Sequence, residues 1–284
     1  MGRLSSLLVA TVAAGTFTQF AYAADLPVKA PPASAPAASY NWTGFYVGGN
    51  AGGGWSADPT VNFAPNDSFS AQIGAGAPTS FRISGALGGF QVGYNWQFNQ
   101  AWVLGVESDF DFSSLRGSGT SSFFSRLPTG IGNNLLQTTN QRVQWFGTVR
   151  GRVGYVAPNN MLVYGTAGFA YGKASENASY ANPGPFGAFT AAANTFGSCL
   201  ANTTCYAGAS KPTLTGWTAG GGLELPLLDH WTIKAEYLFV SLGGNSFIEA
   251  NLPSAPVPAP NASIAVRFGE TDFHVVRGGL NYKF

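Results

Sequence analysis

VRGGLNYKF, residues 276–284, is the stretch that decides the fold. Its residues Val276, Leu280, Tyr282 and Phe284 lie on one face of an alternating strand. In water such a strand would be an exposed apolar edge that invites aggregation. In a closed transmembrane barrel every strand is paired and the outward side chains meet lipid. The stretch therefore favours a transmembrane β-barrel.

The N-terminal segment predicts export. Arg3 is followed by an apolar stretch from Leu4 to Phe20 and then by AYA at 21–23, which fits the small-x-small site of a signal peptidase. We expect residues 1–23 to be a signal peptide, residues 24–40 to be a Pro/Ala-rich periplasmic linker, and residues 41–284 to be the barrel. An N-terminal membrane anchor is the alternative, but the stretch is short and interrupted by Thr and Gln.

Composition narrows the class of protein further. Charged residues make up 10% of the chain, yet no later stretch offers the ~18 consecutive apolar residues of a transmembrane helix. Removing Arg3 from the 14 bases leaves them equal in number to the 13 acids, so no global field indicates nucleic acid or an acidic partner. Cys199 and Cys205 lie close together after an export signal, which predicts a local disulfide. Neither histidine is nearby in sequence, so a metal site is not indicated.

We predict an all-β fold: an eight-stranded antiparallel up-and-down transmembrane β-barrel with four long extracellular loops. Eight alternating segments each approach the ~9–11 residues that a tilted strand needs to cross a bilayer. They are Gly44–Trp55, Gly85–Gln97, Trp102–Phe112, Gln144–Tyr155, Met161–Gly172, Leu214–Leu225, Trp231–Leu242 and Phe273–Phe284. Long and short connections alternate, which places the short ones in the periplasm. A soluble β-sandwich is the alternative, but it has no reason to sort its loops by length.

Strand parity predicts a charged interior. Apolar and aromatic side chains mark the lipid face of each strand, and a lipid-facing Arg or Lys near the midplane costs about 2–4 kcal/mol. The strand charges fall on the opposite parity, and with five acids and four bases we expect a paired lumen network. Its nine residues are Glu107, Asp109, Asp111, Arg150, Arg152, Glu224, Lys234, Glu236 and Arg277.

Tryptophans are expected to form girdles at the two membrane interfaces. Trp42, Trp96, Trp102 and Trp231 lie near the predicted periplasmic strand ends, and Trp55, Trp145 and Trp217 near the extracellular ends. Bases near the extracellular ends lie at the height of lipopolysaccharide phosphates, which predicts a contact with that lipid. These bases are Arg82, Arg116, Arg142, Lys173, Lys211 and Arg267. Solvated loop charges are the alternative interpretation.

Three sequence stretches carry a family resemblance: NWTGFYVGG at 41–49, WVLGVESDFD at 102–111 and WFGTVRGRVGY at 145–155. They resemble the alphaproteobacterial outer-membrane immunogenic proteins, small porin-family barrels of OmpA-like size, and DLPVK at 25–29 is also similar. The Phe284 terminus resembles the C-terminal recognition strand of outer-membrane proteins. From that likeness we expect Val276, Leu280, Tyr282 and Phe284 to be read by the barrel-assembly machinery. The family implies a surface antigen that supports envelope integrity, with no catalytic site.

Few residues could carry catalysis or hold a cofactor. His274 with Asp272, Glu270 and a loop serine is the one constellation worth weighing, and an interfacial histidine is the plainer interpretation. Haem capture is attributed to some relatives of the family, but the expected loops contain no His or Met, leaving Tyr180 and Tyr206 as ligands. We therefore expect no enzymatic activity, no cofactor and no metal.

Two functions remain from different classes: a structural outer-membrane and surface-interaction protein with a closed lumen, and a porin-like channel for small solutes. Eight strands leave an interior only just wide enough for side chains. Numerous inward charges of opposite sign should plug such an interior, which favours the structural function. The extracellular partner of the loops is not encoded in any pattern that we can interpret.

Overall fold

The computed structural model describes residues 40–56, 58–66, 76–126, 132–183, 202–252 and 263–284. The predicted signal peptide and all of the predicted linker except its last residue lie outside these ranges. The described residues form fourteen β-strands. Among them no helix is both long and apolar enough to cross a membrane.

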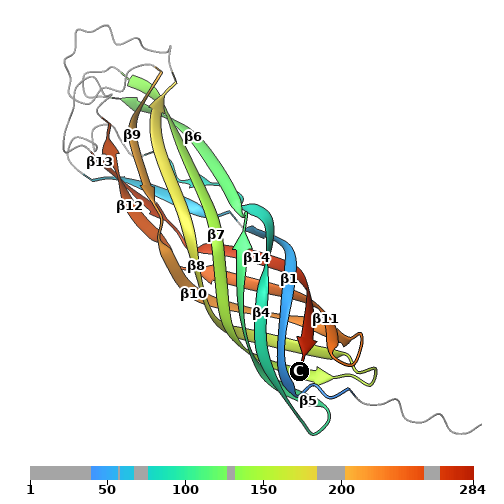
Figure 1. Cartoon of the computed structure of the whole chain (residues 1–284). Coiled ribbons are helices and arrows are strands. Elements are labelled where there is room, and N and C mark those ends of the chain that lie inside the picture. Colours follow the sequence, from blue (N-terminus) through green and yellow to red (C-terminus); the bar gives the residue numbers. More distant parts are fainter. Residues whose placement is uncertain (1–39, 57, 67–75, 127–131, 184–201, 253–262) are drawn as a thin grey trace, which may run out of the picture. The chain divides into compact units, whose positions relative to one another are not determined.

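Eight of the strands close into an antiparallel barrel, which confirms the predicted fold (Figure 1). They are β1 (Gly44–Ser56), β4 (Ser84–Phe98), β5 (Trp102–Ser113), β7 (Gly132–Val156), β8 (Leu162–Asn182), β10 (Thr213–Pro226), β11 (Trp231–Leu242) and β14 (Thr271–Lys283). Each pairs with the next in this order, and β14 pairs with β1 to close the ring, with Gly49 opposite Leu280. Each of these strands is therefore hydrogen-bonded to a neighbour on both sides, as a bilayer requires.

Side chains alternate between the outer and inner faces of the barrel. On β14, Val276 is 50% exposed and Leu280 is 44% exposed. Val275, the residue before Val276, faces the interior and is fully buried. Phe284 is exposed on the same outer face, and its ring contacts Tyr282 at a centroid distance of 5.2 Å. An outward row of apolar side chains is what a lipid-facing strand presents.

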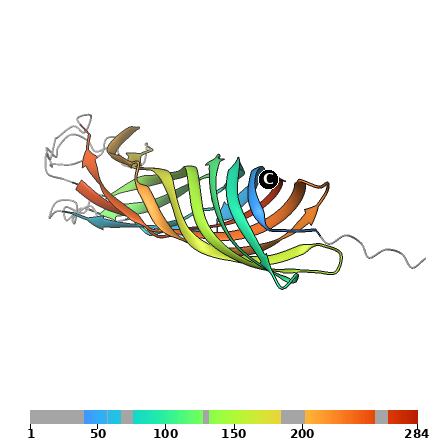
Figure 2. The same cartoon turned by 60° about the horizontal axis from the view of Figure 1, so that its bottom comes forward.

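Short turns join the strands at the end of the barrel where the C-terminus lies (Figures 1 and 2). Between β4 and β5, Asn99 and Gln100 both have positive φ, 52° and 58°, a left-handed backbone conformation that tight hairpin turns use. In outer-membrane barrels short turns face the periplasm. The opposite end, with the long connections, is then extracellular.

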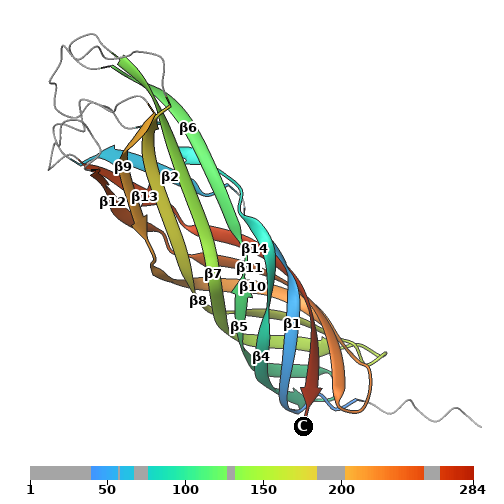
Figure 3. The ribbon, with the colours of Figure 1, turned by 45° about the horizontal axis from the view of Figure 1, so that its top comes forward.

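The long connections contain six further strands that we had expected to be loops. They are β2 (Thr60–Pro65), β3 (Thr79–Ser80), β6 (Arg116–Arg126), β9 (Thr203–Ser210), β12 (Asn245–Asn251) and β13 (Ser263–Phe268). With the parts of β7 and β8 that pair with β6 and β9, they form a sheet ordered β3-β2-β13-β12-β9-β8-β7-β6, which we call the extracellular tier (Figure 3). Thr79 Oγ1 donates to Ser121 Oγ at 3.0 Å and joins the two edges of this sheet.

A β-bulge marks the boundary between barrel and tier on β7. The register with β8 shifts between Val143 and Trp145. Gln141 and Val143 face the interior before the bulge, and Phe146 and Thr148 face it afterwards. One extra residue re-aims the side chains, so the same strand keeps an interior face in both parts.

The two parts have opposite polarity. In the tier the buried side chains are mostly apolar, and the outer face carries Arg, Asn, Ser and Thr, as in a soluble protein. In the barrel the outer face is apolar and much of the interior is charged.

Candidate functional site: the charged lumen

All nine predicted lumen residues have their side chains inside the barrel. None is more than 4% exposed. Charges that lie out of water must be paired and hydrogen-bonded to be tolerated. The pattern of contacts among them is therefore the central feature of the interior.

Arg150 on β7 lies at the centre of the network. Its Nη2 atom is 2.5 Å from Glu107 Oε1 and 2.7 Å from Asp109 Oδ2, both on the adjacent strand β5. Its Nη1 atom is 2.9 Å from Glu236 Oε1 on β11, which is not a neighbour of β7. Its Nε donates to Thr148 Oγ1 at 2.9 Å. One guanidinium thus joins separate parts of the barrel wall across the interior.

Arg277 on β14 makes a second bridge beside the first. Its Nη1 atom is 2.6 Å from Asp111 Oδ2, and its Nη2 atom is 2.7 Å from Asp109 Oδ2. The same Nη2 atom is 2.6 Å from Glu236 Oε2, on the residue directly opposite in the β11–β14 register. Arg150 and Arg277 therefore share Asp109 and Glu236, and each arginine stabilises carboxylates that the other also holds.

The remaining charges extend the network toward the periplasmic end. Lys234 Nζ lies 2.9 Å from Glu107 Oε1. Arg152 Nη2 lies 2.8 Å from Glu224 Oε2, and its Nη1 lies 3.7 Å from Glu107 Oε2. Through Glu107 these two bases connect with the contacts of Arg150, so all nine charges belong to one connected set.

Neutral donors help to satisfy the excess acid. Tyr46 Oη donates to Glu107 Oε2 at 2.7 Å. Asn281 Nδ2 and Thr232 Oγ1 donate to Glu224 Oε1 at 2.8 and 2.6 Å. Sequence analysis missed these three residues, although they have the same inward parity as the charges beside them.

Glycines on neighbouring strands make room for the large charged side chains. Gly52 lies opposite Arg277, and Gly168 lies opposite Arg150. A Cβ atom at Gly52 would lie 2.1 Å from the backbone oxygen of Val276, closer than atoms can approach. These positions fix the strand spacing next to the network.

Trp42 corrects the predicted periplasmic girdle. Its side chain is 1% exposed and packs inside the barrel with Val103, Leu162 and Tyr164. The ring of Tyr164 lies 3.9 Å from the Arg152 guanidinium carbon, a cation–π contact. Parity could not show this, because Trp42 precedes β1 and the chain there turns into the barrel end. The other tryptophans are exposed or half-buried on the outer face.

Apolar side chains lie on the other side of the charges. Phe146 and Phe273 contact each other at a centroid distance of 5.3 Å, and Leu238, Val240 and Val275 are fully buried. The charged layer is thus enclosed between an aromatic layer near the periplasmic end and an apolar layer near the tier. Buried side chains line the interior at each of these levels.

Within the described residues, His274 is not joined to the acids of the catalytic constellation that we weighed. His274 Nδ1 and the Tyr237 hydroxyl are 2.7 Å apart, and the imidazole ring stacks on Trp55 at 5.7 Å. Among the described residues, no hydrogen bond joins the His274 ring to Asp272 or Glu270. Nor does the described part of the chain hold a group of three or more His, Cys, Asp or Glu side chains that could bind a metal ion.

The other predicted sites lie in or on the tier. Tyr180 and Tyr206, weighed as haem ligands, are buried inside it. Cys205 is also buried, whereas Cys199 lies outside the described residues, so the disulfide stays a prediction. The six bases weighed as lipopolysaccharide contacts lie on the outer face, five exposed and Lys173 half-buried.

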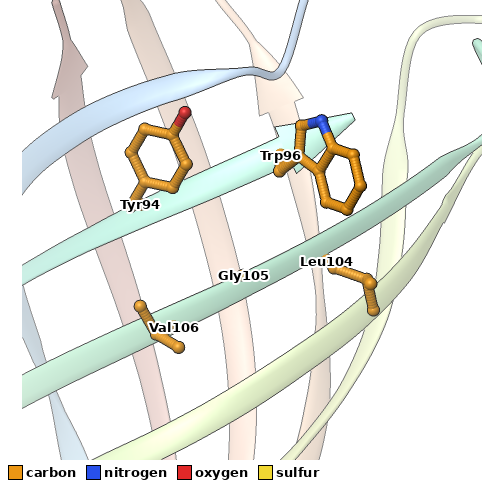
Figure 4. A pocket seen from close by; sticks show the side chains of 5 residues that line it. All are labelled: Tyr94, Trp96, Leu104, Gly105 and Val106. Atoms are coloured by element: carbon orange, nitrogen blue, oxygen red, sulfur yellow. The ribbon is translucent and has the colours of Figure 1, made fainter. Parts of the chain in front are cut away.

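A shallow apolar hollow of about 520 Å³ lies on the outer face of β4 and β5. Tyr94, Trp96, Leu104 and Val106 surround it, and the Gly105 backbone forms its floor (Figure 4). All four side chains are exposed on the face that meets lipid. Its lining suits hydrocarbon chains rather than a polar ligand.

A closed barrel with an apolar outer face and a charged interior defines an outer-membrane barrel protein. The chain belongs to the family described as outer membrane protein beta-barrel domain, which it matches over residues 30–284. It is 35% identical to the 31 kDa outer-membrane immunogenic protein of Brucella melitensis biotype 1, over 99% of this chain and 100% of that protein. It is 26% identical to the 25 kDa outer-membrane immunogenic protein of Brucella abortus biovar 1, over the full length of both.

Among solved structures, the outer membrane protein OprG from Pseudomonas aeruginosa is similar, with a TM-score of 0.48 and 10% identity over 87% of this chain and 98% of that chain. The family match and the relatives confirm the resemblance found in the sequence. The protein is located in the outer membrane.

Proposed function

We propose that this protein is a non-catalytic structural barrel and surface antigen of the outer membrane, with a lumen closed by its charge network. Its contribution is to envelope integrity and surface interactions. The observation that carries the proposal is the connection of non-adjacent strands by Arg150 and Arg277, whose guanidiniums contact carboxylates on β5 and β11. A solute could pass through the lumen only if these contacts were broken. Breaking them would leave buried charges unpaired, which costs several kcal/mol of free energy.

Planar-bilayer recording of the refolded mature chain tests this proposal. We expect no stable single-channel conductance, because three packed layers fill the interior. Incorporation is checked independently by the heat-dependent shift in gel mobility that a closed barrel shows. A stable conductance from fully folded protein would contradict closure and would promote the alternative, a porin-like channel for small solutes.

We further propose that outward bases contact lipopolysaccharide. Arg116 and Arg142 are directly opposite each other on β6 and β7, on the same outer face. Like charges in this position repel each other. A phosphate between them would turn that repulsion into charge-assisted pairing. The Cα partner of Lys173 on β7 is Trp145, one of the tryptophans expected at the extracellular interface, which supports a third contact near that height.

The double substitution Arg116→Gln with Arg142→Gln is expected to lower lipopolysaccharide co-purification by severalfold. Lys283→Gln is the matched control, because Lys283 ends β14 at the periplasmic end of the barrel, away from the extracellular bases. Phosphate content of the purified protein measures the difference. Equal retention in wild type and double variant would show that these bases are ordinary solvated charges.

Phe284 is proposed to act mainly in assembly, where the insertion machinery reads the last strand. In the folded barrel its ring contributes little burial, because the side chain is 71% exposed. Deleting Phe284 should therefore lower the amount inserted while leaving the unfolding midpoint of inserted protein nearly unchanged. Outer-membrane fractionation with heat-modifiability measures both quantities, and insertion at the wild-type level would remove this role.

A further inference from the structure

The interior of the extracellular tier holds a carboxyl group to which the described residues offer no hydrogen-bond partner. Glu249 on β12 is fully buried, and among the described residues neither of its oxygens has a hydrogen-bond partner. The tier's other buried acid is different: Glu176 accepts hydrogen bonds from Gln141 at 3.2 Å and from Asn245 at 2.8 Å. Burial raises the pKa of Glu249 to about 8. Burying an acid without a hydrogen-bond partner destabilises the folded protein. We therefore looked for a function that Glu249 could have.

Aromatic rings lie next to this acid. Tyr180 on β8 is contacted edge to face by Phe63, Phe123 and Tyr206, at centroid distances of 5.9, 5.7 and 6.3 Å. Asn251, two residues after Glu249 and on the same face of β12, is the register partner of Tyr206, which is in turn the register partner of Tyr180. The carboxyl therefore lies on the same interior face as these rings, and burial, followed by the Glu249 charge, raises the pKa of the Tyr180 phenol. Negative ring faces beside a carboxylate form a surrounding that attracts cations.

A second unpartnered polar group belongs to the same place. Gln137 on β7 is the register partner of Tyr180 and is fully buried, and the described residues supply no hydrogen-bond partner for its amide nitrogen or oxygen. The titratable groups that face Glu249 from the packed strands are Tyr180 on β8 and Tyr206 on β9; β13 presents Ile264.

Among the bases whose side chains are described, none neutralises the site from within. Every Lys and Arg of the tier whose side chain is described points outward or is half-buried on the outer face, as the six bases above do. A cation from solution would therefore meet an acid that no internal base already holds.

We propose that the interior of the extracellular tier binds a small organic ammonium ion, with Glu249 as counter-charge, the rings around Tyr180 as walls and Gln137 as a hydrogen-bond partner. Apolar walls with few converging polar groups are typical of small-molecule sites. A Mg²⁺ or Ca²⁺ ion fits less well, because either ion needs about six or more oxygen ligands. This site is separate from the lumen network and does not depend on whether the lumen conducts.

Proton linkage gives the proposal a distinctive readout. At pH 7 the free protein holds Glu249 mostly protonated, since its pKa is about 8. A quaternary ammonium ion has no proton to lose, so its binding to the carboxylate form must release close to one proton from the protein. A buried acid with a purely structural role would release none.

Calorimetric titration of the refolded mature chain with tetramethylammonium chloride tests the site. At pH 7, in two buffers of different ionisation enthalpy, we expect binding with release of close to one proton, and tighter binding at pH 9. Glu249→Gln should weaken binding at least about tenfold and abolish proton release. Glu270→Gln is the matched control, because Glu270 is exposed. The neutral tert-butanol should not bind.

Tyr180→Leu is a second variant, and it is expected to weaken binding roughly fivefold through loss of the cation–π contact. If the gel-mobility assay shows that Glu249→Gln does not fold, Tyr180→Leu still tests the proposal. Absence of tetramethylammonium binding to folded wild type would overturn the proposal. So would equal binding in whichever of the two variants folds.

Discussion

Replacing Arg150 and Arg277 together by Ala is expected to open the lumen and to destabilise the barrel. Both side chains contact Asp109 and Glu236, so a single replacement leaves a neighbouring guanidinium in place, whereas the pair of replacements leaves these carboxylates with neither arginine. Removing one partner of a buried ion pair costs about 3–5 kcal/mol. We expect a loss of at least that size in the free energy of unfolding. Water and ions should enter the emptied volume.

The measurements are urea unfolding in lipid vesicles and conductance in a planar bilayer, both on wild type and double variant. Arg82→Ala is the control: its side chain is 85% exposed and its contact with Asp58 is 3.6 Å long, so little change is expected. An unfolding free energy close to that of wild type would show that the network does not hold the barrel together. A stable but non-conducting variant would assign closure to the Trp42 and Phe146 layers instead.

Gly52→Ala is expected to be strongly destabilising although it adds a single methyl group. The new Cβ would lie 2.1 Å from Val276 O and 2.6 Å from Arg277 Cα, and both are backbone atoms of the adjacent strand. Backbone cannot move aside as a flexible side chain can, so β1 and β14 must separate locally. Overpacking of this kind costs about 1–3 kcal/mol or more.

Gly278→Ala provides the matched control on β14. Its Cβ would point outward and meet only Lys234 O at 3.9 Å. Replacing a strand glycine in open space removes an entropic cost of about 0.5–1 kcal/mol, so this variant should be as stable as wild type or more so. Unfolding in vesicles measures both variants. Equal behaviour of the two would show that strand spacing beside Arg277 is not constrained by Gly52.

The barrel strands were predictable because each carries one uniform pattern, apolar outside and polar or small inside. The strands of the tier were not predictable, because their polarity is the reverse of that in the barrel. Their outward Arg, Asn and Ser side chains resemble those of loop residues. On β7 the bulge at Gln144 also breaks the alternation where the strand continues. Short strands such as Thr79–Ser80 leave no periodic pattern at all.

Parity placed the nine charges in the interior but could not assign their partners. The contact between Arg150 and Glu236 joins β7 to β11, and its length depends on strand tilt and stagger rather than on sequence spacing. Trp42 was wrongly assigned to the periplasmic girdle, because tryptophan is suited both to a membrane interface and to packing inside the end of a barrel. The unpartnered state of Glu249 depends on the folding of the tier, which sequence analysis had not found.

The composite origin of the extracellular tier determines what an antibody can recognise. Adjacent strands β9, β12, β13 and β2 come from three different connections of the chain, yet their outward side chains form one surface. A synthetic peptide that copies one connection lacks the neighbouring strands that hold it extended and supply the rest of the epitope. Antibodies raised against the folded protein should therefore lose much of their binding on denatured chain, and a useful immunogen from this protein must carry the whole tier in its assembled form.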